Sequence, residues 1–223
     1  MSNKTKLATK LAASRRFTFS GFSRAVTAAS IGLCIATGAS AQSIATDVGA
    51  SERINIAGQL STLSQRIIAS ACNLNSGITV RESQAVLQIS AQQFGVISEA
   101  LLHGNRGMGV LGDETRARTL QVIGELNSSW GPLLEQATAT AVAADDNAQI
   151  KELADQSGPL LHTANILVSE ITGQYADPVA LLHADALLID LSGRQRTLAA
   201  QMSKDVCLIA SGINVDEAQA ELA

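Results

Sequence analysis

The segment Leu187 to Ile213 reads LLIDLSGRQRTLAAQMSKDVCLIASGI, and a similar segment occurs earlier in the chain. This earlier segment, Ile54 to Ile78, reads INIAGQLSTLSQRIIASACNLNSGI and aligns with the later one at a constant offset of 135 residues, without a gap. Eight of the 25 aligned positions are identical, and in the earlier segment these are Ile54, Gly58, Thr62, Leu63, Cys72, Ser76, Gly77 and Ile78. The similarity predicts an internal duplication.

The spacing of apolar residues predicts helices along the rest of the chain. We expect five long helices, over about 47–75, 80–102, 113–144, 147–175 and 177–211, and a short helix in the acidic tail 214–223. Thr79 followed by Glu82 is typical of a capping box, and Asp113 is expected to cap the third helix. Pro132 and Pro159 are expected to kink or break the third and fourth helices, because proline removes a backbone donor.

Short connectors predict that neighbouring helices are antiparallel. The expected fold class is therefore all-α, an up-and-down bundle of four to five long antiparallel helices that contains the internal repeat. With five helices, the first and the last run in the same direction, so the two similar segments would lie side by side with matched residues level. A break at either proline would change this arrangement.

Residues 1–41 have the features of an export signal. They hold six of the sixteen Lys and Arg residues and no Asp or Glu, and an apolar run over 25–36 precedes Ala39-Ser40-Ala41. This run is shorter than the roughly 20 residues of a spanning helix, which makes a retained membrane anchor the lesser alternative. A twin-arginine route is suggested by Arg15 and Arg16, but Thr18 stands where that motif prefers Phe, which favours the general secretory route. We expect cleavage after Ala41 and a periplasmic location.

The chain after this signal is acidic. Ten Lys and Arg residues stand against twenty Asp and Glu residues, so the net charge is about −10 rather than the −4 of the whole chain. Nucleic acids and anionic membranes bind clustered basic residues, so neither is expected as a partner.

Two cysteines remain once Cys34 is removed with the signal. In an oxidising compartment, Cys72 and Cys207, at matched positions of the repeat, are expected to form a disulfide rather than two free thiols. The chain has no C-x-x-C-H haem motif and no Cys/His spacing that suits zinc, so no cofactor and no metal are expected.

Both segments carry a partial sequence box that resembles a known family. The earlier copy has Ile54-Asn55, Ala57-Gly58 and Leu63-Ser64-Gln65-Arg66, and the later copy has Gly193-Arg194-Gln195-Arg196. This pattern resembles the box of PilJ-type periplasmic sensing domains and is similar to that of nitrate/nitrite sensor kinases. Neither copy is complete, because Gln59 and Ser61 replace two arginines in the first copy and Ala199-Ala200-Gln201 replaces Ser-Gln-Arg in the second.

The resemblance implies a site for a small anion. In nitrate/nitrite sensors the arginine matched by Arg196 holds an oxyanion together with its symmetry mate across a dimer interface, so the resemblance also allows a homodimer. Arg196 has no carboxylate three or four residues away on its own helix, whereas Arg194 has Asp190 four residues before it. The candidate ligand-binding residues are Arg196, Arg194, Thr197, Gln65 and Arg66. The alternative for each arginine is a salt bridge or a solvated position.

The sequence favours a binding protein over an enzyme. The histidines, His103, His162 and His183, have no Ser or Asp spacing that suggests a triad, and each is expected at the surface or between helices. Our first hypothesis is an exported, PilJ-like sensory domain without a transmitter, which passes its signal to a separate membrane-bound receptor or transducer. The second is a structural or interaction protein of the cell envelope that has lost the ligand.

Overall fold

The computed structural model describes residues 40–140, 146–175 and 183–223, and this part of the chain is almost entirely helical. Its elements are α1 (Ser40–Asn75), α2 (Val80–His103), the short 3-10 helix η1 (Arg106–Met108), α3 (Ala117–Thr140), α4 (Asn147–Tyr175), α5 (His183–Ala210) and α6 (Val215–Leu222). The described residues contain no strand, only an isolated bridge between Asn105 and Val110. The predicted all-α class is confirmed, and so is the short helix in the tail.

The predicted export signal lies largely outside the described residues. The described part of α1 begins at Ser40, two residues before the expected first residue of the mature chain, Gln42. None of the helices in the described ranges combines the length and the apolar composition that crossing a membrane requires.

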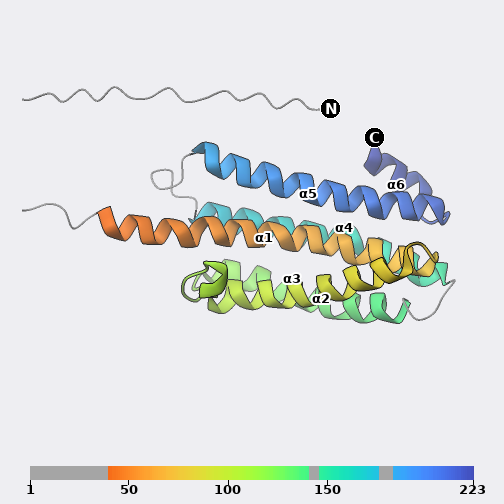
Figure 1. Ribbon diagram of the computed structural model, residues 1–223, viewed down its shortest axis with the longest axis horizontal. Helices are drawn as coiled ribbons and strands as arrows, with labels where there is room; N and C mark the ends of the chain where they lie inside the picture. The colour runs from red at the N-terminus through yellow and green to blue at the C-terminus, as the bar shows by residue number, and fades with distance from the viewer. Residues whose placement is uncertain (1–39, 141–145, 176–182) are drawn as a thin grey trace, which may run out of the picture. The chain divides into compact units, whose positions relative to one another are not determined.

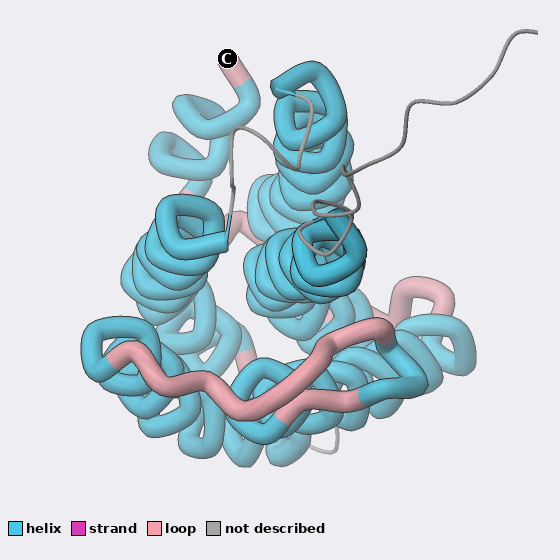
Figure 2. The backbone as a smooth tube through the Cα atoms, turned by 90° about the vertical axis from the view of Figure 1, so that its left-hand side faces the viewer, coloured by secondary structure: helices cyan, strands magenta, loops and turns pink. Residues whose placement is uncertain are grey.

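Helix α1 is the central helix of the fold (Figure 1). It packs against α2 and α4 in an antiparallel bundle that α3 completes, and α5 lies along α1 outside this bundle. Helices α1 and α5 run in the same direction, as the sequence predicts, and α6 folds back beside the end of α5 (Figure 1). The view along the bundle shows α5 and α6 on the far side of α1 from α2 and α3 (Figure 2). Helices α4 and α5 both pack on α1 but make little contact with each other.

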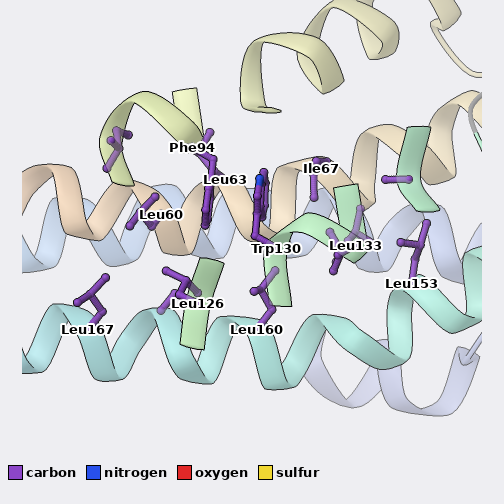
Figure 3. Packing of buried hydrophobic residues seen from close by; sticks show 14 of the residues in the cluster. Leu60, Leu63, Ile67, Phe94, Leu126, Trp130, Leu133, Leu153, Leu160 and Leu167 are labelled. Carbon is purple, nitrogen blue, oxygen red and sulfur yellow. The ribbon is translucent and has the colours of Figure 1, made fainter. Parts of the chain in front are cut away.

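The apolar core lies between α1, α2, α3 and α4 (Figure 3). Phe94 of α2 and Trp130 of α3 stack face to face with ring centroids 3.7 Å apart, beside Leu63 of α1. Leucine and isoleucine side chains of all four helices fill the space around this pair. Burial of these side chains is the main stabilising term of the bundle.

The prolines do not break their helices, so the break that was one of the two expected outcomes does not occur. Helix α3 continues through Pro132 and α4 continues through Pro159. Both prolines are exposed, as are the glycines that precede them. On the solvent side of a helix, water can bind the carbonyl that a proline leaves without a donor, so the helix is not forced to end there.

Two predicted helix caps are wrong. Thr79 precedes α2 with a left-handed φ of 42° and makes no side-chain cap, and its hydroxyl instead bonds the Ser83 hydroxyl at 3.2 Å. Helix α3 begins at Ala117, four residues after Asp113. The acidic side chain that binds backbone donors there is Glu114, which accepts from the N–H groups of the next two residues at 2.9 Å each.

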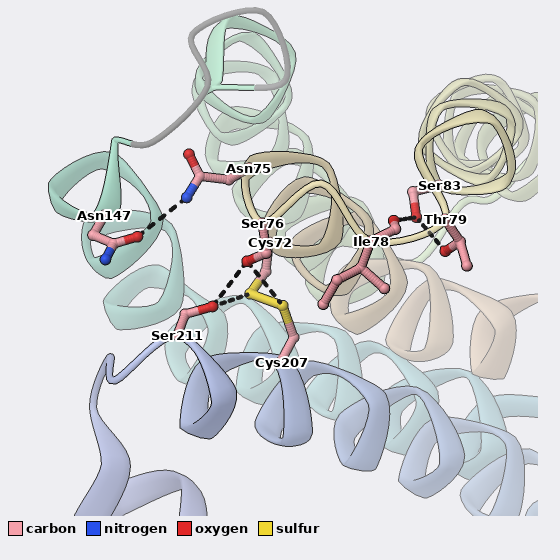
Figure 4. The surroundings of a disulfide bond; sticks show 9 residues. All are labelled: Cys72, Asn75, Ser76, Ile78, Thr79, Ser83, Asn147, Cys207 and Ser211. Atoms are coloured by element: carbon pink, nitrogen blue, oxygen red, sulfur yellow. Dashed lines mark hydrogen bonds between the residues drawn. A yellow bond between two sulfur atoms is a disulfide. The ribbon is translucent and has the colours of Figure 1, made fainter.

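Matched residues of α1 and α5 contact one another. Cys72 and Cys207 form a disulfide with their Cα atoms 6.2 Å apart, which confirms the predicted pairing (Figure 4). The hydroxyls of Ser76 and Ser211 lie 2.9 Å apart beside it. Each pair is separated by 135 residues, so matched positions are level, as the parallel arrangement requires.

The turns that follow α1 and α5 also have the same backbone conformation. Positive φ angles occur at matched positions, with 67° and 69° at Gly77 and Gly212 and 42° and 47° at Thr79 and Asn214. The backbone hydrogen bonds of both turns recur at the same spacing, with lengths of 2.8 to 3.1 Å. Glycine adopts a positive φ without steric cost, which explains the glycine at this position of both turns. The duplication itself stays a hypothesis from the sequence.

Candidate functional site

A groove opens between α4 and α5, with α1 as its floor. Its volume is about 660 Å³, within the range of small-molecule sites in proteins. The groove exists because α4 and α5 flank α1 without closing on each other. Its lining includes three of the five candidate residues, Arg194, Arg196 and Thr197.

Arg196 has a guanidinium group without a carboxylate partner among the described residues. Its side chain is exposed, and Nη2 donates to the amide oxygen of Asn55 on α1 at 3.2 Å. The ion pairs of the described residues do not include Arg196, so the salt bridge that was the alternative for this arginine is absent from the described part of the chain. One neutral acceptor leaves several N–H donors of the planar fork available for an anion.

Arg194 and Thr197 are already partnered within the protein. Arg194 Nε donates to Asp190 Oδ2 at 2.9 Å, the intrahelical pair that the sequence suggests. The buried Thr197 hydroxyl lies 3.1 Å from the Thr62 hydroxyl and 3.2 Å from the Gly193 carbonyl oxygen. Both residues line the groove, but neither presents a free charge to it.

Gln65 does not line the groove. Its side chain is buried, with the amide oxygen accepting from Ser157 Oγ at 2.9 Å and the amide nitrogen donating to Ser64 Oγ at 3.3 Å. Gln65 therefore joins α1 to α4 in the interior. Sequence spacing alone does not distinguish this buried position from a face that opens to a ligand.

Arg66 is exposed and lines a second groove of about 340 Å³, between α1, the start of α2 and α5. Arg196 lies on the boundary and lines this groove as well. The described residues include no side-chain partner for Arg66. Of the five candidates, Arg196 is therefore the one that both grooves share.

Two matched glycines lie in the wall of the larger groove. A Cβ atom added at Gly58 would have no heavy atom within 4 Å, and one added at Gly193 would meet only Arg196 Nη2, at 4.0 Å. Glycine inside a helix is unfavourable by about 1 kcal/mol relative to alanine. The two residues keep the groove open beside the guanidinium.

A buried polar cluster at the other side of α1 was not anticipated from the sequence. Arg53, only 2% exposed, donates to the carbonyls of Leu101 at 3.0 Å and Leu111 at 3.2 Å and to that of Gly112. Its Nη1 lies 3.8 Å from Glu114 Oε2. The cluster fixes the loop between α2 and α3 to α1.

Glu114 has further partners at the end of α4. The side chains of Gln174 and Tyr175 each donate to its carboxylate at 3.0 Å. Burial acts to raise the pKa of Glu114, but hydrogen bonds from backbone N–H groups, Gln174 and Tyr175 outweigh it and lower the pKa below 4.5. The cluster is closed to solvent and satisfied, which indicates a structural role.

A second buried charge cluster joins α5 to α6. Lys204 Nζ lies 3.1 Å from Asp205 Oδ1 and 2.9 Å from Glu221 Oε2. Asp205 is 1% exposed, its Oδ1 meets the Lys204 ammonium, and its Oδ2 has no hydrogen-bond partner in the described part of the chain. Burial raises the pKa of Asp205 above 3.8, and the Glu221 carboxylate adds to this effect against the opposing effect of Lys204.

Neither of the two histidines whose side chains are described belongs to a group that could hold a metal ion. His103 Nε2 lies 3.8 Å from Glu99 Oε2 on the surface, His162 is exposed, and the side chain of His183 lies outside the described residues. Across the described ranges, no group of three or more His, Cys, Asp or Glu side chains could hold a metal ion.

A comparison with protein families gives one match. The family model described as "PilJ: Type IV pili methyl-accepting chemotaxis transducer N-term" matches residues 44–156, just over half of the chain. The match covers the first sequence box and most of the α1–α4 bundle, and it ends before α5. No curated protein and no solved structure matches the chain.

Proposed function

This chain belongs to the PilJ family of type IV pili methyl-accepting chemotaxis transducer N-terminal domains, and we propose that it senses an anion through Arg196. PilJ domains are sensory and non-catalytic, and they typically lie in the periplasm. The observation that carries the proposal is the exposed Arg196 guanidinium, which borders a groove and, among the described residues, has only the neutral Asn55 as a partner. A guanidinium group binds carboxylates and planar oxyanions through two parallel hydrogen bonds.

We further propose that the domain acts outside the cytoplasm after cleavage at Ala41. The support is the basic and apolar pattern of residues 1–41, together with the family's typical location. A membrane-bound transducer is the natural class of partner for such a domain. Intact-mass measurement of protein recovered from the periplasm checks the maturation, and a recovered chain that retains residues 1–41 contradicts it.

Thermal unfolding with and without anions tests the anion site. A ligand that binds only the native state raises the unfolding midpoint by mass action. Nitrate, nitrite and acetate are the probes, with chloride at equal ionic strength as the reference. We expect a rise in the midpoint for at least one of them in the wild type.

Matched arginine variants assign the effect to a residue. Arg196→Ala should remove the anion-dependent rise and change the stability of the free protein by less than about 1 kcal/mol, because only one neutral hydrogen bond is lost. Arg196→Lys should restore the response poorly. The control Arg118→Ala removes the same charge from α3, where Arg118 pairs with Glu170 at 3.6 Å, and should keep the response.

The structural alternative predicts a different pattern. If the protein is a ligand-free component of the cell envelope, no anion raises the midpoint of the wild type. Arg196→Ala then changes nothing that depends on anions, and the sensory proposal fails.

A further inference from the structure

The larger groove has room for a ligand much larger than a small inorganic oxyanion. A four-atom ion displaces roughly the volume of two or three water molecules, less than about 100 Å³. The groove offers about 660 Å³, a volume typical of sites for drug-sized organic molecules. An ion on Arg196 would leave most of the groove filled with water.

Part of the remaining wall of the groove is apolar. Ile54, Leu161, Val168 and Ile189 contribute from three helices. Several hydroxyls that line the groove are used within the protein, since Ser61 donates to Asn165 Oδ1 at 3.0 Å and Ser169 donates to the Asn165 carbonyl at 3.0 Å. A ligand therefore meets apolar side chains between polar ones such as Thr172 and Gln201, with the available guanidinium of Arg196 at its border.

We propose that this groove binds an organic monocarboxylate with an extended apolar body, its carboxylate on Arg196 and its hydrocarbon part along α1 between α4 and α5. The inference rests on the anion site proposed above and adds the class of ligand. Charge selects the head group. The acidic residue in the groove, Asp190, is neutralised by Arg194, whereas the positive charge of Arg196 is not neutralised. The open space at Gly58 admits the body of the ligand.

A series of straight-chain carboxylates tests the proposal by titration calorimetry on the purified protein. Acetate, hexanoate and octanoate are compared below the concentration at which micelles form, with octan-1-ol as the uncharged counterpart and nitrate as the small anion. Full burial of the two methylenes that octanoate adds to hexanoate would raise the affinity about fifteenfold. In a groove that is partly open, we expect a rise of at least about fourfold, and weaker binding of octan-1-ol.

Blocking variants separate the groove from the guanidinium. Gly58→Leu places a side chain in the open space and should weaken octanoate binding about tenfold or more. Gly124→Leu is its matched control, because Gly124 is also a helical glycine with open space around its Cβ position, on α3 outside the groove. If Gly58→Leu does not fold by its helical circular dichroism signal, Ser169→Trp fills the groove from an exposed position on α4.

The outcomes distinguish this inference from the function it rests on. Affinity that rises with chain length, falls at least tenfold in Arg196→Gln and falls in a blocking variant supports it. Equal affinity for acetate and octanoate, or octanoate binding unchanged by the blocking variants, overturns the inference and leaves the anion sensor in place. Octan-1-ol binding as tightly as octanoate also overturns it. No binding of any anion ends both proposals.

Discussion

The hydroxyl oxygens of Thr62 on α1 and Thr197 on α5 lie 3.1 Å apart, although 135 residues separate them in the chain. The same separation recurs in the disulfide of Cys72 with Cys207. A contact between identical residues at matched positions requires the two helices to run in parallel and in register. The interface is therefore built from residues that the two sequence segments share.

The disulfide should be a major contribution to stability. It closes a loop of 135 residues, which in the chain-entropy model contributes about 3 to 5 kcal/mol to the free energy of unfolding. We expect the variant with both Cys72→Ala and Cys207→Ala to lose a stability of this order, as measured by denaturant unfolding. Reductant should lower the free energy of unfolding of the wild type by a similar amount and leave that of the double variant unchanged. A wild type whose stability does not respond to reductant contradicts the prediction.

Glu114 should contribute stability that is lost in acid. Its pKa is lowered in the folded protein, so its contribution is complete above 4.5 and disappears as the pH falls through the lowered pKa. Glu114→Gln leaves Arg53 without its carboxylate, which should cost about 2 to 4 kcal/mol at pH 7. The difference in free energy of unfolding between the variant and the wild type should shrink below pH 4.5, as measured by urea unfolding at a series of pH values. Tyr175→Phe, which removes one hydrogen bond, should cost only about 1 kcal/mol.

Asp205 should behave in the opposite way. Its pKa is raised in the folded protein, so the folded state holds the proton more firmly, and stability falls as the pH rises through the raised pKa. The stability of Asp205→Asn should therefore rise relative to that of the wild type between acid and neutral pH. At pH 7 we expect its free energy of unfolding to be equal to that of the wild type or higher by up to about 1 kcal/mol.

Lys204→Met provides the contrast on the same cluster. It leaves the buried Asp205 carboxylate without a cation and should cost about 3 to 5 kcal/mol at neutral pH. Equal losses in Lys204→Met and Asp205→Asn would show that Asp205 is stabilising, against this prediction.

The outer face of α5 should mediate association with a second copy of the chain. Leu198 is 57% exposed, whereas its matched residue Leu63 is 2% exposed in the core, and Met202 and Ile67 show the same contrast. A helix face with this apolar pattern is typical of an interface between helices. Sedimentation should give a dimer for the wild type and a monomer for Met202→Glu. Val96→Glu, an equally exposed apolar position on α2, is the control that should remain dimeric.

The sequence predicted the helices, the parallel pair and the disulfide because these depend on apolar spacing, connector length and matched positions. The Arg53 cluster was not predictable in this way. Its partners lie at Leu101, Glu114 and Tyr175, and no local pattern in the sequence brings these residues together. Arg53 reads only as a charged residue in a helix.

The candidate site was predicted in part. The structure leaves Arg196 exposed on the groove, but Gln65 is buried. The face of α1 that corresponds to the Arg196 face of α5 packs against α4, so Gln65 lies in the interior. The capping box at Thr79 failed for a related reason. Its residues fit the pattern, but the turn required a left-handed backbone there, which the pattern does not report.

The disulfide is the covalent link between α5 and α1, and it lies near the end of α5, so a tilt of α5 about this link would act as a lever. Arg196 lies eleven residues before Cys207, about 16 Å from it along the helix. His183, at the start of α5, lies about 36 Å from Cys207 along the same helix. If α5 tilts about its linked end, a displacement at the groove is roughly doubled at His183. A ligand that widens the groove by about 1 Å would therefore move the start of α5 by about 2 Å.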